Sequence, residues 1–117
     1  MFVKKNHKAA IKNKLKNGNT VIAPIKNNIC SYLIAGNENT VGVRVPNHLF
    51  CKELSKLFQN PITSTSVNRT GEKPHTKPDD ILNEFKDDID LIIDDGIING
   101  IGSKIFLFEN GSWKKLR

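Results

Sequence analysis

A run of hydroxyl-bearing side chains that ends in a glycine is the stretch of this sequence best suited to holding an anion. After Pro61 the sequence reads Ile-Thr-Ser-Thr-Ser-Val-Asn-Arg-Thr-Gly, ending at Gly71. Hydroxyls, a carboxamide and a guanidinium all donate hydrogen bonds, and successive backbone N–H groups in such a loop form a concavity for anions. We therefore predict phosphate or carboxylate binding here, with Gly71 allowing close approach of the backbone. The alternative is a Ser/Thr-rich turn that holds no ligand.

The composition indicates a basic protein of one domain or part of one. The chain has 117 residues, a formal net charge of +6 and 38% hydrophobic residues, which favours anionic partners such as nucleotides or RNA. Its two cysteines, Cys30 and Cys51, give no disulfide framework, and no apolar run is long enough to span a membrane. We expect a cytoplasmic protein that does not enter a membrane.

The residues before the loop predict two helices and two strands. A basic segment, residues 1–19, contains a short helix ended by Gly18, and the stretch 29–34 is apolar but of undetermined type. The remaining elements are a strand at 20–23, a strand at 40–46 and a helix at 48–58 capped by Asn47.

The residues after the loop predict a further helix and three strands. The helix begins at Lys77-Pro78, carries Ile81, Leu82 and Phe85 inward and ends near Asp87. The strands are a buried one at 91–93 and a hairpin formed by 104–108 and 112–116. Strands alternating with helices and ending in a hairpin favour an α/β fold with a twisted, mixed parallel and antiparallel sheet and flanking helices.

Several motifs in order resemble one family. The loop reads Pro-x-x-x-Thr-Ser-x-Asn-x-x-Gly from Pro61 to Gly71, and Val-x-Val-Arg-Val-Pro precedes it at 41–46. Weaker matches are Gly-Asn-Thr-Val-Ile at 18–22 and Asp-Asp-Gly at 94–96 followed by Gly-Ser at 102–103. Together they resemble the YrdC-like family, the L-threonylcarbamoyl-AMP synthases of tRNA modification. The resemblance runs from about Thr20 to Arg117 and covers the C-terminal half to two-thirds of that domain.

The resemblance implies an activity and a set of ligand-binding residues. In this family ATP, bicarbonate and L-threonine give threonylcarbamoyl-AMP and pyrophosphate, with Mg²⁺ accompanying ATP. The residues that match nucleotide-binding positions are Thr40, Ser66, Asn68 and Arg117, and those that match threonine-binding positions are Arg44, Ser64 and Ser103. No catalytic residue is assigned by the match.

Part of the family pattern is missing from this sequence. The family's Pro-Thr-x-Thr-x-Tyr-Gly-Leu strand and Lys-x-Arg motif do not occur here. We therefore expect residues 1–117 to form a partial YrdC-like domain that is incomplete on its own, either a reduced synthase or one that needs a separately encoded N-terminal half. The alternatives are a non-catalytic module that binds nucleotide, tRNA or double-stranded RNA, and a truncated remnant.

Two sets of side chains also permit a metal interpretation. His48 and Cys51, with Cys30 and His75, have one short spacing typical of a metal site, but one spacing does not build a tetrahedral centre. The acidic residues between 87 and 95 have the oxygen ligands that Mg²⁺ prefers, although helix-end solvation and a turn explain them as well. We expect no protein-bound metal apart from the Mg²⁺ of ATP.

Overall fold

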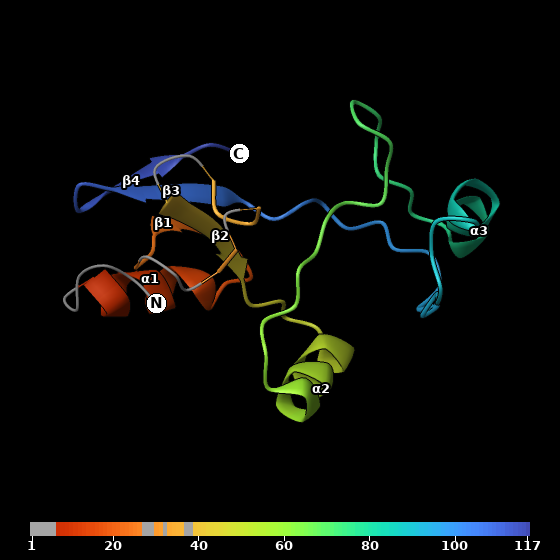
Figure 1. Cartoon of the computed structure of the whole chain (residues 1–117), viewed down its shortest axis with the longest axis horizontal. Helices are drawn as coiled ribbons and strands as arrows, with labels where there is room; N and C mark the ends of the chain where they lie inside the picture. Colours follow the sequence, from red (N-terminus) through yellow and green to blue (C-terminus); the bar gives the residue numbers. More distant parts are fainter. Residues whose placement is uncertain (1–6, 27–29, 32, 37–38) are drawn as a thin grey trace. The chain divides into compact units, whose positions relative to one another are not determined.

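The computed structural model describes residues 7–26, 30–31, 33–36 and 39–117, and the chain divides into two compact units. Unit 1 comprises residues 1–60 and 102–117, and unit 2 comprises residues 61–101. Figure 1 shows the sheet with helices α1 and α2, which belong to unit 1, and helix α3, which belongs to unit 2.

Unit 1 is built on a four-stranded sheet of mixed direction. Its strand order is β2-β1-β3-β4, with β1 antiparallel to β2 and parallel to β3, and with β3 antiparallel to β4. This arrangement confirms the predicted α/β class. The strands are β1 (Thr20–Pro24), β2 (Thr40–Arg44), β3 (Ile105–Glu109) and β4 (Ser112–Lys115).

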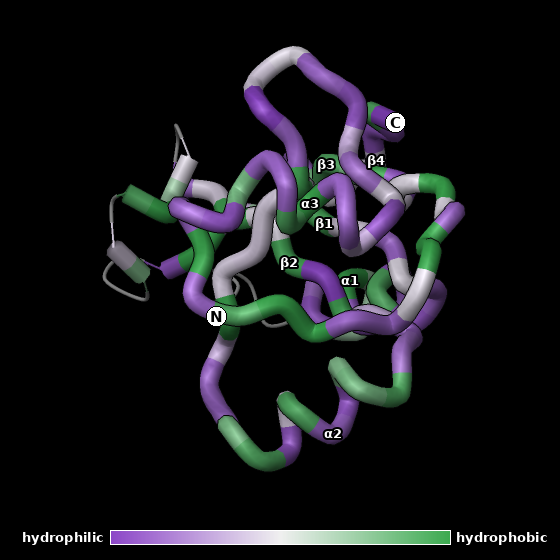
Figure 2. The backbone as a smooth tube through the Cα atoms, turned by 90° about the vertical axis from the view of Figure 1, so that its right-hand side faces the viewer, coloured by the Kyte–Doolittle hydropathy of each residue, from purple (hydrophilic) through white to green (hydrophobic). Residues whose placement is uncertain are grey.

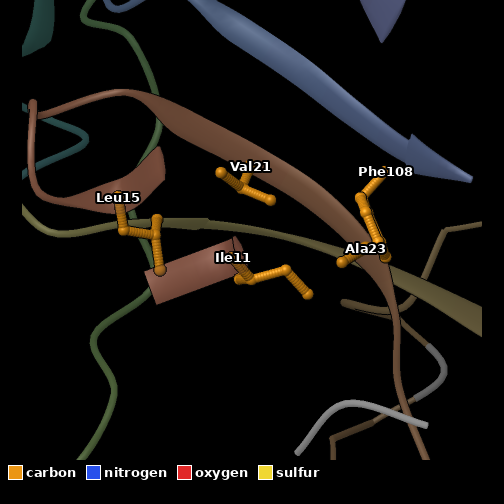
Figure 3. Packing of buried hydrophobic residues seen from close by; sticks show 5 residues of the cluster. All are labelled: Ile11, Leu15, Val21, Ala23 and Phe108. Carbon is orange, nitrogen blue, oxygen red and sulfur yellow. The ribbon is translucent and has the colours of Figure 1, made fainter. Parts of the chain in front are cut away.

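The core of unit 1 forms where helix α1 (Lys8–Leu15) covers the central strand β1. Ile11 and Leu15 lie one helical turn apart and are buried, so they project from the same side of α1. Val21 and Ala23 are buried alternate residues of β1, and Phe108 of β3 completes the cluster, as Figure 3 shows. The predicted helix is confirmed, but it ends at Leu15 with Lys16 as its cap residue, and Gly18, where φ is +68°, lies in the turn that follows.

The predicted hairpin is confirmed, and its turn has the backbone that the sequence favours. Asn110 and Gly111 join β3 to β4 with φ values of 50° and 81°. Two successive residues at positive φ are typical of the tight turns that match the twist of paired strands. Trp113 of β4 packs beside Phe108, with ring centroids 4.7 Å apart.

The second helix of unit 1, α2 (Leu49–Phe58), differs from its prediction at the first residue. His48 occupies the cap position with an extended backbone and no side-chain cap bond. The predicted cap, Asn47, instead accepts a hydrogen bond from Lys52 Nζ at 2.7 Å, because the helix starts one residue later than expected. No residue of α2 is buried, and Figure 2 shows apolar and polar residues alternating along it.

Unit 2 contains one helix, α3 (Pro78–Phe85), and differs from the prediction in two places. The helix begins with proline at its first turn and acidic residues beside it, as expected, but Leu82 is 50% exposed. The predicted buried strand at 91–93 is wrong: these residues are not in a strand, and Leu91 and Ile93 are 76% and 58% exposed. A short apolar run becomes a buried strand only where neighbours supply ladder bonds and cover, and here the described chain supplies neither.

Two further stretches complete the described chain. Residues 30–31 and 33–36 form a turn, while the remaining positions of the apolar stretch 29–34, residues 29 and 32, lie outside the described residues. Asn39 has a φ of 55° at the entry to β2, and residues 37 and 38 of the predicted turn are also outside the description. Among the described residues, no helix has the length and apolar character needed to cross a membrane.

Candidate functional site

One edge of the unit 1 sheet gathers four residues that are distant in sequence. Thr20 is the register partner of Arg44 in β2 and of Ile105 in β3. The Ile105 N–H donates to the carbonyl of Arg117 at 3.0 Å, which brings the residue after β4 to the same edge. We call Thr20, Arg44, Ser103 and Arg117 the sheet-edge cluster.

Two hydroxyls of this cluster are hydrogen-bonded to each other. Thr20 Oγ1 and Ser103 Oγ lie 2.7 Å apart, and the Thr20 N–H donates to the Lys104 carbonyl at 2.8 Å, fixing the two strands in register. Both hydroxyl residues are half-buried. Each hydroxyl has one proton and two lone pairs, so the pair retains one O–H donor for a third group. Such a pair can hold an anionic oxygen.

Arg44 is anchored at this edge through Nε, the one of its side-chain nitrogens that bonds to a residue in the described part of the chain. Its Nε donates to the Gly18 carbonyl at 3.1 Å, and the side chain is exposed. No ion pair joins Arg44 to another residue that the structure describes. The terminal nitrogens are therefore available for the planar two-point contact that guanidinium makes with carboxylate or phosphate.

Arg117 is folded back over the start of the segment that leads into β3. Its Nε and Nη2 both donate to the Ser103 carbonyl, at 3.2 and 3.1 Å. A Cβ added at Gly102 would lie only 3.2 Å from Arg117 Nη2, so the absence of a side chain there makes room for the guanidinium. The structure thus places a second positive charge beside the Thr20–Ser103 hydroxyl pair.

Thr40 lies at the other end of β2 from Arg44. It is the register partner of Pro24, and its carbonyl accepts from the Gly36 N–H at 2.8 Å. Four residues along a strand span about 13 Å. Of the four nucleotide- or threonine-binding positions expected in unit 1, the structure brings together Arg44, Ser103 and Arg117, and does not bring Thr40 to them.

The hydroxyl-rich loop belongs to unit 2 and is shaped by its own backbone. The Asn68 N–H donates to the Ser66 carbonyl at 3.2 Å, and Asn68 Nδ2 donates to the Arg69 carbonyl at 2.8 Å. Asn68 Oδ1 is buried and has no partner among the described atoms. Because this oxygen is an acceptor, it suits a donor on a ligand, such as a sugar hydroxyl, better than a phosphate oxygen. Ser64 and Ser66 are exposed.

Gly71 has a backbone conformation that favours glycine. Its φ is +87°, a left-handed conformation that side chains disfavour, and a Cβ added there would meet nothing within 4 Å. The residue therefore turns the chain, and the space beside it is open; the expected approach of an anion to its backbone stays a prediction.

Arg69 holds the loop against α3. Its Nε lies 3.2 Å from Glu84 Oε1 and its Nη2 lies 2.9 Å from Asp88 Oδ2. The other carboxylate oxygen of Glu84 lies 2.5 Å from His75 Nε2. We call Arg69, His75, Glu84 and Asp88 the loop clamp. Because two carboxylates already neutralise Arg69, its role here is to fix the loop.

Sequence reasoning missed Thr20 as a member of the sheet-edge cluster and Gly102 as the residue that makes room for Arg117. Both residues lie in motifs that carry the family resemblance, Thr20 in Gly-Asn-Thr-Val-Ile at 18–22 and Gly102 in Gly-Ser at 102–103. What the sequence does not give is the parallel pairing of β1 with β3 that joins them. His75, considered as a metal ligand, contacts Glu84, and no group of three or more potential metal ligands occurs within the described part of the chain.

Comparisons with known proteins agree on one family. A family model described as telomere recombination, covering Sua5, YciO and YrdC proteins, matches residues 2–117. The chain is 29% identical over 96 residues to a threonylcarbamoyl-AMP synthase of Idiomarina loihiensis, a match that covers 74% of this chain and 51% of that relative. It therefore spans about half the length of this curated relative.

A solved structure has the same fold. The crystal structure of E. coli YciO matches with a TM-score of 0.83 at 22% sequence identity, over 99% of this chain and 57% of that one. This likeness confirms the mixed sheet with its helices. With the family model matching nearly every residue, the chain belongs to the Sua5/YciO/YrdC family.

Proposed function

We propose that this chain supplies amino-acid-binding and nucleotide-binding residues for a threonylcarbamoyl-AMP synthase, which transfers AMP from ATP to threonyl carbamate. The observation that carries the proposal is the sheet-edge cluster, in which Arg44, Arg117 and the Thr20–Ser103 hydroxyl pair come from four separate segments to the same edge of the sheet. Family membership and the name of the Idiomarina loihiensis relative support the same reaction.

The proposed reaction explains why positive charge and hydroxyls are needed. A carbamate oxygen attacks the α-phosphorus of ATP, the bond from that phosphorus to the pyrophosphate oxygen breaks, and threonylcarbamoyl-AMP and pyrophosphate are formed. Both reactants are anions, so the protein must offset their repulsion and hold them in line. Arg44 suits the threonine carboxylate through its terminal nitrogens, with the Thr20–Ser103 pair donating beside it.

The nucleotide contacts are assigned separately in the two units. In unit 2, Ser66 offers an exposed hydroxyl and Asn68 an unpartnered acceptor oxygen, which fits a ribose hydroxyl. In unit 1, Arg117 supplies a positive charge for phosphate. Ser64 on the threonine side and Thr40 on the nucleotide side stay predictions, with no contact in the structure that supports them.

We assign no protein ligand to the Mg²⁺ that accompanies ATP. The described residues offer no cluster of three or more potential ligands, and Mg²⁺ commonly binds through substrate phosphates and water with few carboxylates. When bound with ATP, the ion would offset phosphate charge. The residues named above act by binding and orientation.

Because the chain spans about half of its relative, we infer that it binds ligands without completing the reaction alone. A catalytic residue is not assigned. The alternative of a non-catalytic module for tRNA or double-stranded RNA stays a prediction, since the structure gives it no specific contact.

The test is a titration of the chain with L-threonine, followed by calorimetry or chemical-shift changes. Arg44→Ala should weaken binding at least about tenfold, because a hydrogen-bonded pair with a charged group contributes about 1.5–3 kcal/mol. Thr20→Val, which keeps the shape and removes the hydroxyl, should weaken it by a smaller factor. Lys26→Gln removes one exposed positive charge beyond the other end of β1 and should change nothing. Equal affinity of the wild type and Arg44→Ala would contradict the assignment, as would an absence of saturable binding.

A further inference from the structure

Asn68 holds a buried hydrogen-bond acceptor for which the described chain supplies no partner. Its Nδ2 donates to the Arg69 carbonyl at 2.8 Å, so the nitrogen end of the amide is fixed and Oδ1 is the end left over. Oδ1 is buried and has no hydrogen-bond partner among the described atoms. Buried polar atoms in folded proteins nearly always have a partner, so this acceptor calls for an explanation.

The residues on both sides of Asn68 are held by backbone bonds. The Val67 carbonyl accepts from the His75 N–H at 2.9 Å, and the Arg69 carbonyl accepts from the Glu72 N–H at 3.0 Å as well as from Asn68 Nδ2. A side chain between two fixed backbone positions, with its own amide nitrogen bonded, has few orientations left. The turn at residues 67–75 therefore gives Oδ1 a defined direction.

Side chains fasten the two ends of this turn to one carboxylate on α3. Arg69 Nε lies 3.2 Å from Glu84 Oε1, and His75 Nε2 lies 2.5 Å from Glu84 Oε2. The Phe85 ring lies beside both partners, 4.6 Å from the guanidinium carbon of Arg69 and 6.0 Å from the His75 ring, measured to the Phe85 centroid. Glu84 is 27% exposed, so solvent screens it less than it screens a carboxylate on the surface. Glu84 is thus the residue on which both ends of the turn depend.

We propose that the loop clamp is a positioning device that directs Asn68 Oδ1 at a ribose hydroxyl, so that the chain distinguishes nucleotides by that hydroxyl. The inference rests on the nucleotide-binding role of the loop in the proposed function. It adds Glu84, acting through Arg69 and His75, as a positioning residue that does not touch the ligand. All of these residues belong to unit 2.

The chemistry of Oδ1 decides which part of a nucleotide depends on the clamp. An amide oxygen only accepts, so it can bond to a hydroxyl and cannot bond to an ionised phosphate oxygen. Ser66 lies outside the turn at 67–75, and its exposed hydroxyl can donate to phosphate without the clamp. Opening the clamp should therefore weaken recognition of ribose and leave the affinity for phosphate alone unchanged.

The test measures the affinities of the 117-residue chain for ATP, 2′-deoxy-ATP and 3′-deoxy-ATP by calorimetry, with inorganic pyrophosphate as a ligand that has no ribose. A site that bonds to a hydroxyl disfavours the analogue that lacks it, so the wild type should bind one of the two analogues about fivefold more weakly than ATP. Glu84→Ala should reduce this ratio to less than about twofold. Glu84→Gln, which can still accept from Arg69, should keep an intermediate ratio.

The matched control is Glu53→Ala, which removes an exposed carboxylate paired with Lys56 on α2 and changes the net charge by the same amount. It should leave the ratio between ATP and the analogues unchanged. Pyrophosphate affinity should be the same in Glu84→Ala and in this control. A fall in pyrophosphate affinity for Glu84→Ala alone would show that the clamp supports the whole loop, and would overturn the specific link to ribose.

A double-variant cycle separates positioning from folding. Asn68→Ala removes the acceptor, so ATP and both analogues should bind equally, and adding Glu84→Ala to it should change nothing further. A clamp that only kept the loop folded would weaken binding again in that background, and the inference would be wrong. Alanine favours helix, so α3 should persist in Glu84→Ala; if circular dichroism shows otherwise, Glu84→Gln carries the same comparison.

Two failures can be told apart. Equal wild-type affinity for ATP and both analogues, or an unchanged ratio in Glu84→Ala, would overturn the inference and leave the other binding roles in the proposed function standing. The absence of saturable ATP binding would overturn the inference together with the nucleotide role of Ser66 and Asn68. Threonine binding that depends on Arg44 would be unaffected by either result.

Discussion

Units 1 and 2 differ in what holds them together. Every hydrophobic residue that is buried in the described chain lies in unit 1, and all but one form a single cluster between α1 and the sheet. Unit 2 instead relies on the loop clamp, in which Arg69 and His75 share the carboxylate of Glu84, and on backbone bonds such as the His75 N–H to the Val67 carbonyl at 2.9 Å. The apolar side chains of unit 2 contribute little burial.

The difference shows that an apolar pattern stabilises a fold only when a matching surface is present. Helix α1 offers just Ile11 and Leu15, yet both are buried because β1 lies against them. Helix α2 has a wider apolar side, and none of its residues is buried. The hydrophobic contribution follows the area removed from water, so α1 gains it and α2 does not.

The largest expected effect comes from emptying the unit 1 core. Phe108 is 4% exposed and packs edge-on against His7 and at a tilt against Trp113. Phe108→Ala should lower the free energy of unfolding of unit 1 by about 3–5 kcal/mol, because it removes apolar contact and leaves a cavity. Denaturant unfolding followed by the fluorescence of Trp113, the single tryptophan, measures this.

The matched comparison is Leu57→Ala in α2. That side chain is 84% exposed, so its truncation should change the stability by less than about 0.5 kcal/mol. Comparable destabilisation by Phe108→Ala and Leu57→Ala would show that α2 is covered in the isolated chain, and the contrast between the two helices would fail.

A smaller effect is expected from opening the loop clamp of unit 2. Glu84→Gln keeps the size of the side chain but removes the charge that faces both Arg69 and His75. The arginine side chain is 54% exposed, so solvent screens the pair, and we expect a loss of about 1 kcal/mol in local stability. Hydrogen exchange of the His75 amide, bonded to the Val67 carbonyl, should become about fivefold faster.

The control for the clamp uses the same substitution on an exposed pair. Glu53→Gln removes the partner of Lys56 on α2, where both side chains are more than half exposed. It should change the free energy of local opening, measured by hydrogen exchange, by no more than about 0.5 kcal/mol. If Glu84→Gln leaves the His75 amide as protected as in the wild type, the clamp does not stabilise the loop.

The comparison of units 1 and 2 also explains how much of the fold could be predicted from the sequence. Local signals were sufficient where they specify backbone conformation, as at Gly18, Asn110 and Gly111. The strand expected at 91–93 failed because an apolar run carries no information about whether a neighbour is present to pair with it. The predicted cap, Asn47, was wrong by one residue, because His48 occupies the cap position, and helix boundaries are ordinarily uncertain by this much.

The candidate site was predictable in residue type and less so in geometry. Arg44, Ser103 and Arg117 were identified from motifs, and the structure places them at one edge of the sheet. Thr40 lies at the other end of β2 because four residue steps along one extended strand separate it from Arg44, as the strand predicted from the sequence already implies. Thr20 joined the cluster only through the parallel pairing of β1 with β3.

The smallest effect is expected at Gly102. A substitution there tests whether the position of Arg117 in the sheet-edge cluster depends on the lack of a side chain at residue 102. A Cβ there would lie 3.2 Å from Arg117 Nη2 and 3.4 Å from its Cζ, whereas one at Gly100 in unit 2 would have its nearest neighbour at 3.9 Å. Arg117 is exposed, so Gly102→Ala should displace the guanidinium by a few tenths of an ångström rather than unfold the sheet. The stability should change by less than about 0.5 kcal/mol, because the lost bonds are exposed and alanine reduces the freedom of the unfolded chain.

The informative measurement is therefore the Arg117 Nε–H signal in an NMR spectrum, since this proton now bonds to the Ser103 carbonyl at 3.2 Å. Gly102→Ala should shift it, and Gly100→Ala should not. If the proposed nucleotide role of Arg117 is also correct, Gly102→Ala should weaken ATP binding by a few-fold while Gly100→Ala leaves it unchanged. An unmoved Arg117 signal would show that the edge tolerates a side chain at position 102, and the glycine would then have no part in shaping the sheet-edge cluster.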